Sequence, residues 1–186
     1  MIGIRRKDSA YQMVFLRSQF NRLEDLPNKI RELLEEMDAE SPAIQRLFPI
    51  ASSDPEVARE FRDLAAEDIR VRKLENLAAF ERSLEGARPE KAVDLVFLKI
   101  TPEDFEYWIG FLNDMRLLLG TELGIEDDSW DAGEAYEETG DVRILLYDYL
   151  NYVQGALLHV FMNEEDELWP GDEDEDDADL DDGDWV

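Results

Sequence analysis

A C-terminal run of acidic residues places the strongest limit on what this chain can fold into. From Asn163 to Val186 it carries fourteen Asp and Glu residues and no Lys or Arg, and the last basic residue is Arg143. This run supplies half of the net charge of -28. Its few apolar side chains cannot bury enough surface to offset the entropy lost on folding. We therefore expect a folded domain over residues 1–162 and a disordered acidic tail over residues 163–186.

The acidic tail also contains apolar residues among its carboxylates. Like charges spaced by apolar anchors favour a fast, salt-sensitive encounter with a basic protein. The sequence therefore predicts that the tail binds a partner through Leu168, Trp169, Asp172, Asp176, Leu180 and Trp185. The alternative is that the tail only keeps the protein soluble.

The composition of the remaining chain argues against several classes of partner. Residues 1–162 contain 33 acidic and 19 basic residues, which disfavours direct binding to nucleic acid or to an anionic membrane surface. No run of about 20 apolar residues and no signal-peptide pattern is present, so we expect a cytoplasmic protein. The chain has no cysteine, which excludes disulfides and thiolate metal ligands within it.

Apolar periodicity predicts a mainly helical α+β fold. Residues 2–6 and 11–16 suit a hairpin, and residues 92–100 contain the best further strand. Long stretches with helical spacing make up most of the rest. We therefore expect a single domain of long packed helices with a small antiparallel sheet on one side.

Helix starts are expected where a side chain can cap the first turn, at Ser18, Asp54 and Thr101, and the last helix is expected to begin at about Asp141. Pro27 either kinks the first of these helices or begins a second one, and Ser41-Pro42 ends that element. The helix from Asp54 runs to Gly86 or breaks near Asp68. Residues 125–140 are expected to form an acidic loop, and the last helix extends to Met162.

Little in the sequence indicates catalysis. General acid–base chemistry most often uses histidine, and His159 is the only one. It lies among apolar residues near the end of a helix, which favours a structural role. The chain shows neither a nucleophile elbow nor a glycine-rich phosphate loop. We therefore predict a protein that is not an enzyme and that uses no cofactor.

One acidic stretch has the spacing of a calcium loop. The spacing of an EF-hand loop places its ligands at Asp127, Ser129, Asp131 and Glu138. Ala132 occupies the sixth position, where the sharp turn requires glycine. We therefore expect no specific metal site.

Arg116 lies beside the apolar stripe of its predicted helix, because it follows Leu112 by four residues and precedes Leu119 by three. An arginine buried there needs an acceptor, and Asp148 or Gln154 on the last helix could supply it. The sequence favours a structural clamp built from Arg116, Asp148 and Gln154 over a ligand-binding arginine.

Several strings taken in order resemble the actinobacterial family named for the actinomycete oxidative stress regulator. They are Arg46-Leu-Phe-Pro49, Glu60-Phe-Arg-Asp-Leu64 with Arg72-Lys73, Trp108 with Asn113-Asp-Met-Arg-Leu-Leu-Leu-Gly120, and Tyr147-Asp-Tyr-Leu150 with Gln154. The resemblance covers residues 2–162 and leaves out the tail.

The resemblance implies a non-enzymatic regulator that contacts an alternative sigma factor or RNA polymerase in a stress response. It also implies that the gene lies beside the gene for the adaptor of the N-end-rule protease. The alternative function is therefore that of a proteostasis accessory. The family's redox control relies on a cysteine pair that this chain lacks, and Glu122 and Tyr149 also depart from the family pattern. Intrinsic thiol sensing is therefore not expected, while homo-oligomerisation stays open.

Overall fold

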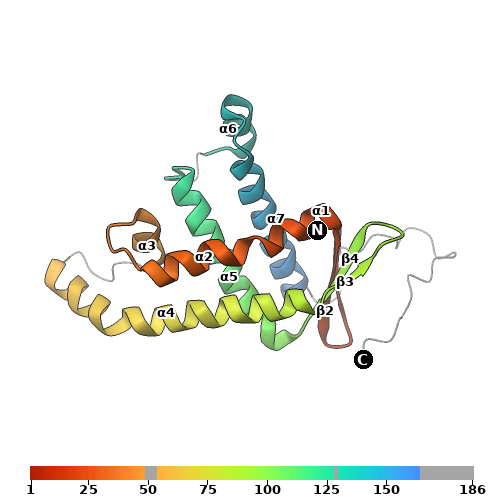
Figure 1. Ribbon diagram of the computed structural model, residues 1–186, viewed down its shortest axis with the longest axis horizontal. Coiled ribbons are helices and arrows are strands. Elements are labelled where there is room, and N and C mark those ends of the chain that lie inside the picture. The colour runs from red at the N-terminus through yellow and green to blue at the C-terminus, as the bar shows by residue number, and fades with distance from the viewer. Residues whose placement is uncertain (49–53, 128–129, 164–186) are drawn as a thin grey trace.

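The computed structural model describes residues 1–48, 54–127 and 130–163, with backbone alone at 55 and 58–64. Helices dominate and a four-stranded antiparallel sheet lies at one end (Figure 1), as the sequence predicts. In chain order the elements are β1 (Gly3–Lys7), β2 (Ala10–Leu16), α1 (Arg17–Glu24), α2 (Leu26–Glu36), α3 (Pro42–Leu47), α4 (Pro55–Glu85), β3 (Arg88–Glu90), β4 (Leu95–Ile100), α5 (Pro102–Glu122), α6 (Ala132–Thr139) and α7 (Val142–Met162).

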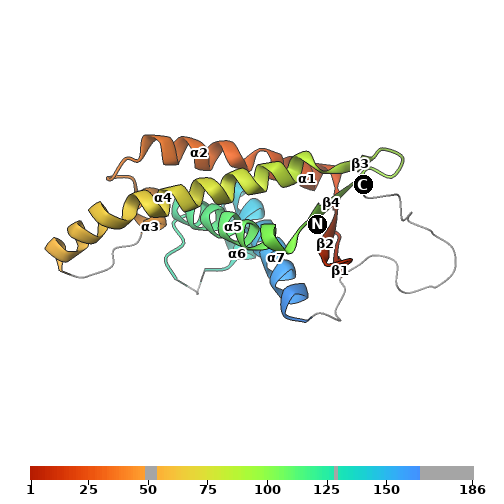
Figure 2. The ribbon, with the colours of Figure 1, turned by 90° about the horizontal axis from the view of Figure 1, so that it is seen from below.

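The sheet has the strand order β1-β2-β4-β3. Its first hairpin turns at Asp8 and Ser9, whose φ angles of 51° and 59° belong to the left-handed region. Two such residues form the tight turn that matches strand twist. The hairpin was predicted, whereas the short exposed strand β3 was not. Figure 2 shows the helices gathered on one side of this sheet.

Two of the three predicted helix caps, Asp54 and Thr101, are confirmed, and Asp141 caps the last helix at its predicted start. The side chains of Asp54, Thr101 and Asp141 accept hydrogen bonds from backbone N–H groups in the first turns of α4, α5 and α7. The cap at Ser18 is wrong, because α1 already begins at Arg17 and the Gln19 side chain accepts from Leu16 N instead. A cap residue predicts the start of a helix best where no other nearby side chain can accept the hydrogen bonds of the first-turn N–H groups.

Prolines divide the helices more finely than the apolar pattern does. Pro27 lies in the first turn of a separate helix α2, and Pro42 begins α3 where the sequence indicated only an end. The helix from Asp54 is continuous to Glu85, without a break at Asp68. The predicted acidic loop contains α6, whose first turn is capped by Asp131. None of the helices in the described ranges is long and apolar enough to cross a bilayer.

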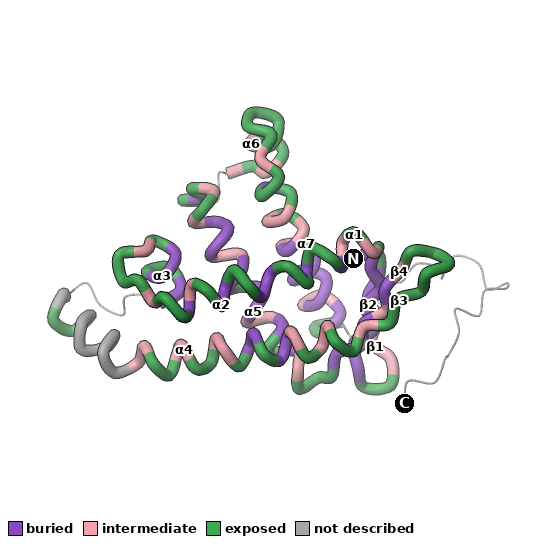
Figure 3. The backbone as a smooth tube through the Cα atoms, in the orientation of Figure 1, coloured by how far each residue is buried: buried purple, intermediate pink, exposed green. Residues whose placement is uncertain are grey.

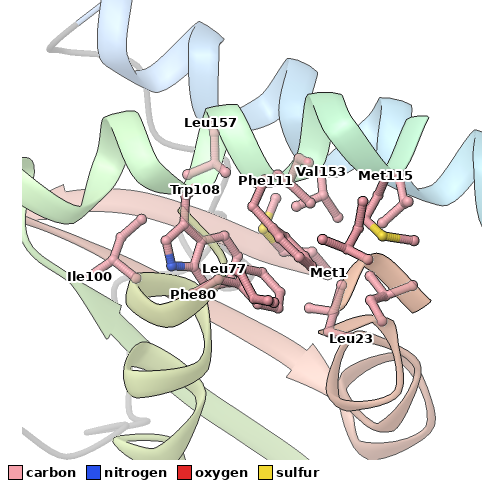
Figure 4. Packing of buried hydrophobic residues seen from close by; sticks show 14 of the residues in the cluster. Met1, Leu23, Leu77, Phe80, Ile100, Trp108, Phe111, Met115, Val153 and Leu157 are labelled. Atoms are coloured by element: carbon pink, nitrogen blue, oxygen red, sulfur yellow. The ribbon is translucent and has the colours of Figure 1, made fainter. Parts of the chain in front are cut away.

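Buried stretches of α4, α5 and α7 come together in the core (Figure 3), and aromatic side chains from α4 and α5 fill its centre (Figure 4). The rings of Phe80 and Phe111 stack with centroids 4.0 Å apart, and Trp108 lies 4.4 Å from Phe80. Trp108 is fully buried, as its place on the apolar stripe predicted. Burying rings of this size dominates the energetics of such a core.

Two helical glycines should respond in opposite directions to alanine. A Cβ at Gly110 would lie 2.3 Å from Nδ2 of the buried Asn76 on α4, whereas a Cβ at the exposed Gly155 on α7 meets nothing within 4 Å. We expect Gly110→Ala to destabilise the fold by about 1–3 kcal/mol through overpacking. Gly155→Ala should stabilise it by about 0.5–1 kcal/mol. Urea unfolding of both variants tests this, and a stabilised Gly110→Ala would contradict the close helix approach.

Candidate partner interface

Two of the three residues predicted to form a clamp lie together. Arg116 Nη1 on α5 donates to Gln154 Oε1 on α7, and Gln154 Nε2 donates 3.4 Å to the carbonyl oxygen of Ile109. Asp148 takes no part in this contact: it is exposed and lines a pocket elsewhere on α7. The structure therefore joins α5 to α7 through Arg116 and Gln154. This contact lies inside the helix pair and offers no site for a ligand.

The six tail residues predicted to bind a partner lie outside the described residues. They are Leu168, Trp169, Asp172, Asp176, Leu180 and Trp185. The described chain ends at Asn163, whose backbone N–H and side-chain amide both donate to the carbonyl oxygen of His159. His159 lies half-buried in the last turn of α7.

A cleft around Trp130 is the most distinctive surface of the described chain. Two pockets of about 480 and 430 Å³ share Trp130 and Asp131 in their walls. The walls come from the end of α3, the end of α5 and the segment after it, α6, and the first half of α7. We call these two pockets together the acidic cleft. Its carboxylates are Glu122, Glu126, Asp127, Asp131, Glu134, Glu138, Asp141 and Asp148.

Two arginines set the charge of the acidic cleft. Arg46 Nη1 donates 3.0 Å to the carbonyl oxygen of Ile125, which ties α3 to the cleft wall. Arg143 hydrogen bonds to Asp141 and lies 3.7 Å from Glu122. The bond from Arg143 lowers the pKa of Asp141 from its ordinary value of 3.8. Eight carboxylates against two guanidinium groups leave the cleft negative at neutral pH.

Aromatic and amide groups complete the cleft. Trp130 meets Tyr147 edge to face, with ring centroids 5.5 Å apart. The Oδ1 atom of Asn151 is buried in the same wall and accepts no hydrogen bond from the described residues. A ligand that brings a cation, a flat apolar surface and a donor therefore matches this cleft.

The calcium-like spacing does not produce a metal site. Asp131 Oδ1 instead accepts a 2.8 Å hydrogen bond from Glu134 N at the start of α6. Ser129 lies outside the described residues, and no group of three or more potential ligands that could hold a metal forms among those described.

Sequence reasoning missed Trp130 and the cleft because it treated residues 125–140 as a solvated loop. The cap pattern of Asp131 with Glu134 three residues later was the available signal for α6. The convergence of α3, α6 and α7 on Trp130 depends on tertiary packing, which periodicity does not specify.

The family model described as domain of unknown function DUF2017 matches residues 1–161. No curated protein and no solved structure matches the chain. The match runs from the first hairpin through nearly all of α7, and so includes the acidic cleft and the Arg116–Gln154 contact. The chain therefore belongs to the DUF2017 family.

Proposed function

We propose that this protein is a non-enzymatic regulator that acts by contact with another protein, an alternative sigma factor or RNA polymerase, without intrinsic thiol redox sensing. The actinomycete oxidative stress regulator family is the finer assignment that we propose for it. The acidic cleft is the observation that carries the proposal.

Strings far apart in the sequence that carry the family resemblance meet at the acidic cleft. Arg46 belongs to the first string, and Tyr147 and Asp148 belong to the last. All three line the larger of the two pockets. Both pockets are open and polar, which suits a protein segment better than an enclosed small molecule.

The chemistry of the cleft selects a basic segment. Lys or Arg side chains can pair with its carboxylates, and an arginine can stack on the exposed part of Trp130. A donor on the partner would satisfy Asn151 Oδ1, which removes the cost of a buried unpaired acceptor. Sigma factors and polymerase subunits carry basic surfaces for DNA, so they present segments of this kind.

Charge reversal in the cleft should weaken partner binding. We expect Glu126→Lys with Asp148→Lys to reduce affinity by about tenfold or more, since like charges would then face the basic partner. Both side chains are exposed, so the fold should tolerate the change. The measurement is the Kd for the purified alternative sigma factors and core RNA polymerase of the host, by biolayer interferometry at low and moderate salt.

Glu103→Lys with Glu106→Lys is the matched control, because these exposed carboxylates line a different groove between α4 and α5. Equal loss in both double variants would mean that net charge alone governs binding. Absence of binding to any sigma factor or polymerase subunit would overturn the proposal. Capture of the protease adaptor in its place would favour the proteostasis alternative.

A further inference from the structure

The outward face of the sheet carries a cluster of positive charge. Strand alternation places residues of β1, β2, β4 and β3 on two faces. One face holds Ile4, Met13 and Leu98, which belong to the helix-covered core. The opposite face holds four cations and one carboxylate, which are Arg5, Lys7, Arg88, Lys99 and Glu90. We call this face the basic sheet face.

The basic sheet face has an apolar centre. Val14 and Phe97 are cross-strand partners in the middle of the sheet, and neither belongs to the core cluster, although Val14 is only 1% exposed and Phe97 is partly exposed. Around them, Arg5 Nε donates 2.9 Å to Gln12 Oε1 across β1 and β2, and Lys99 is the β4 partner of Gln12. Cations around aromatic and aliphatic side chains suit a ligand that combines carboxylates with large apolar residues.

We propose that the basic sheet face is a docking surface for an acidic, tryptophan-containing peptide, and that the chain's own tail, residues 163–186, is the peptide that occupies it. The tail offers fourteen carboxylates together with Trp169 and Trp185. Its charge and its two aromatic anchors complement the cations and the apolar centre of the face. The inference concerns the chain alone and does not depend on the partner proposed above.

The tail begins near an edge of the sheet. Phe161 in the last turn of α7 stacks on Phe105 with ring centroids 4.6 Å apart, and the Phe105 ring lies 5.0 Å from that of Tyr11, which is on the helix-covered face of β2. The helix α7 also packs against β1. Four strands span only about 14 Å across a sheet, whereas a random coil of the same number of residues as the tail has an end-to-end distance of about 25–30 Å. The tail can therefore cover the whole face.

Two other surfaces of the described chain repel the tail. The acidic cleft is strongly negative, and the groove between α4 and α5 places Asp68, Glu75, Glu103 and Glu106 around Arg72. Covalent attachment gives the tail an effective concentration of about millimolar at its own sheet. Weak ion pairs, each worth about 1 kcal/mol or less, are then sufficient for occupancy at low salt.

A spin label on the tail provides a direct test. The chain has no cysteine, so Asp181→Cys gives a single attachment point in the full-length protein. We expect the label to broaden amide signals of β1, β2 and β4, while α3 and α6 keep their intensity. The broadening should disappear at about 1 M NaCl, where the Debye length falls to about 3 Å. If the amide signals of β1, β2 and β4 keep their full intensity at low salt, the proposal is overturned.

Charge reversal on the sheet gives an independent result. Arg88→Glu with Lys99→Glu should abolish the broadening, while Lys29→Glu with Arg72→Glu, an equal change of charge on α2 and α4, should leave it intact. Broadening that survives the sheet variant would overturn the docking surface. If the sheet variant fails to fold, the salt titration of the spin-labelled protein with its native sheet residues still tests the docking surface.

Mixing distinguishes the chain's own tail from that of a second copy. Isotope-labelled protein without a spin label is combined with spin-labelled protein without isotopes. We expect no broadening in this mixture. Broadening of the sheet signals in the mixture equal to that in the singly labelled protein would overturn the intramolecular occupant.

Discussion

Replacing Lys73 by methionine should cost about 3–5 kcal/mol of folding stability. Lys73 Nζ on α4 lies 2.6 Å from Asp114 Oδ1 on α5, and the two side chains are only 12% and 5% exposed. The variant leaves the carboxylate of Asp114 in the core without its cation, which is the costly way to break a buried pair. Urea unfolding at pH 7 measures the loss.

The pH dependence of Lys73→Met identifies the cause. Burial raises the pKa of Asp114 in the native protein, and Lys73 opposes that rise. Without Lys73 the pKa rises further, so the folded state takes up a proton more readily than the unfolded state. The stability deficit should therefore narrow as the pH falls from 7 towards 5. A deficit independent of pH would mean that lost packing, not the unpaired carboxylate, destabilises the variant.

Two further variants bracket this effect. Lys73→Met combined with Asp114→Leu should recover most of the loss, since an apolar pair can replace a buried ion pair. Lys29→Met removes a cation 3.9 Å from Glu122 but 44% exposed, so it should change stability by about 1 kcal/mol or less.

The parts of the fold that follow from local chemistry could be predicted from the sequence. Asp54, Thr101 and Asp141 start helices because their side chains satisfy backbone N–H groups at once. The hairpin follows from Asp8 and Ser9, which lie between two short segments that suit strands. The exposed strand β3 could not be predicted in this way, because its three residues pair with β4 and bury nothing.

In the candidate site, too, local spacing predicted some residues, whereas the arrangement that depends on tertiary packing could not be predicted. Arg116 was found because its position beside an apolar stripe demands an acceptor, and Gln154 supplies it. Asp148 satisfied the same spacing argument but faces the acidic cleft, since helix spacing fixes a face only to within about one residue. The cleft itself joins Arg46, Trp130 and Tyr147 from distant segments, and no local pattern specifies that arrangement.

Docking of the tail on the basic sheet face would give the tail a regulatory role. The acidic cleft and the basic sheet face are built from different elements, so a basic partner in the cleft need not touch the sheet. A partner that also binds the tail must first displace it from the basic sheet face. Such competition weakens the partner's apparent affinity for the protein. The apparent Kd equals the intrinsic Kd divided by the fraction of molecules in which the tail is released.

The amino group of Met1 should make stability fall as the pH decreases from 8 to 5. Burial lowers its pKa from 8.0 to about 5, so the folded state excludes a proton that the unfolded state binds. Stability is then full above pH 8 and lost progressively down to pH 5.

The direct measurement is an NMR titration of isotope-labelled Met1, which separates this group from the many carboxylates. We expect a midpoint near 5, and a midpoint near 8 would contradict burial of the amine.

The amine donates to Gln19 Oε1 at 2.8 Å and to the Tyr149 hydroxyl at 3.0 Å. Tyr149→Phe removes the second acceptor and should cost about 1 kcal/mol, whereas Tyr152→Phe, half-exposed on the same helix, should be neutral. Equal effects of the two substitutions would show that the contact to Met1 contributes nothing to the fold.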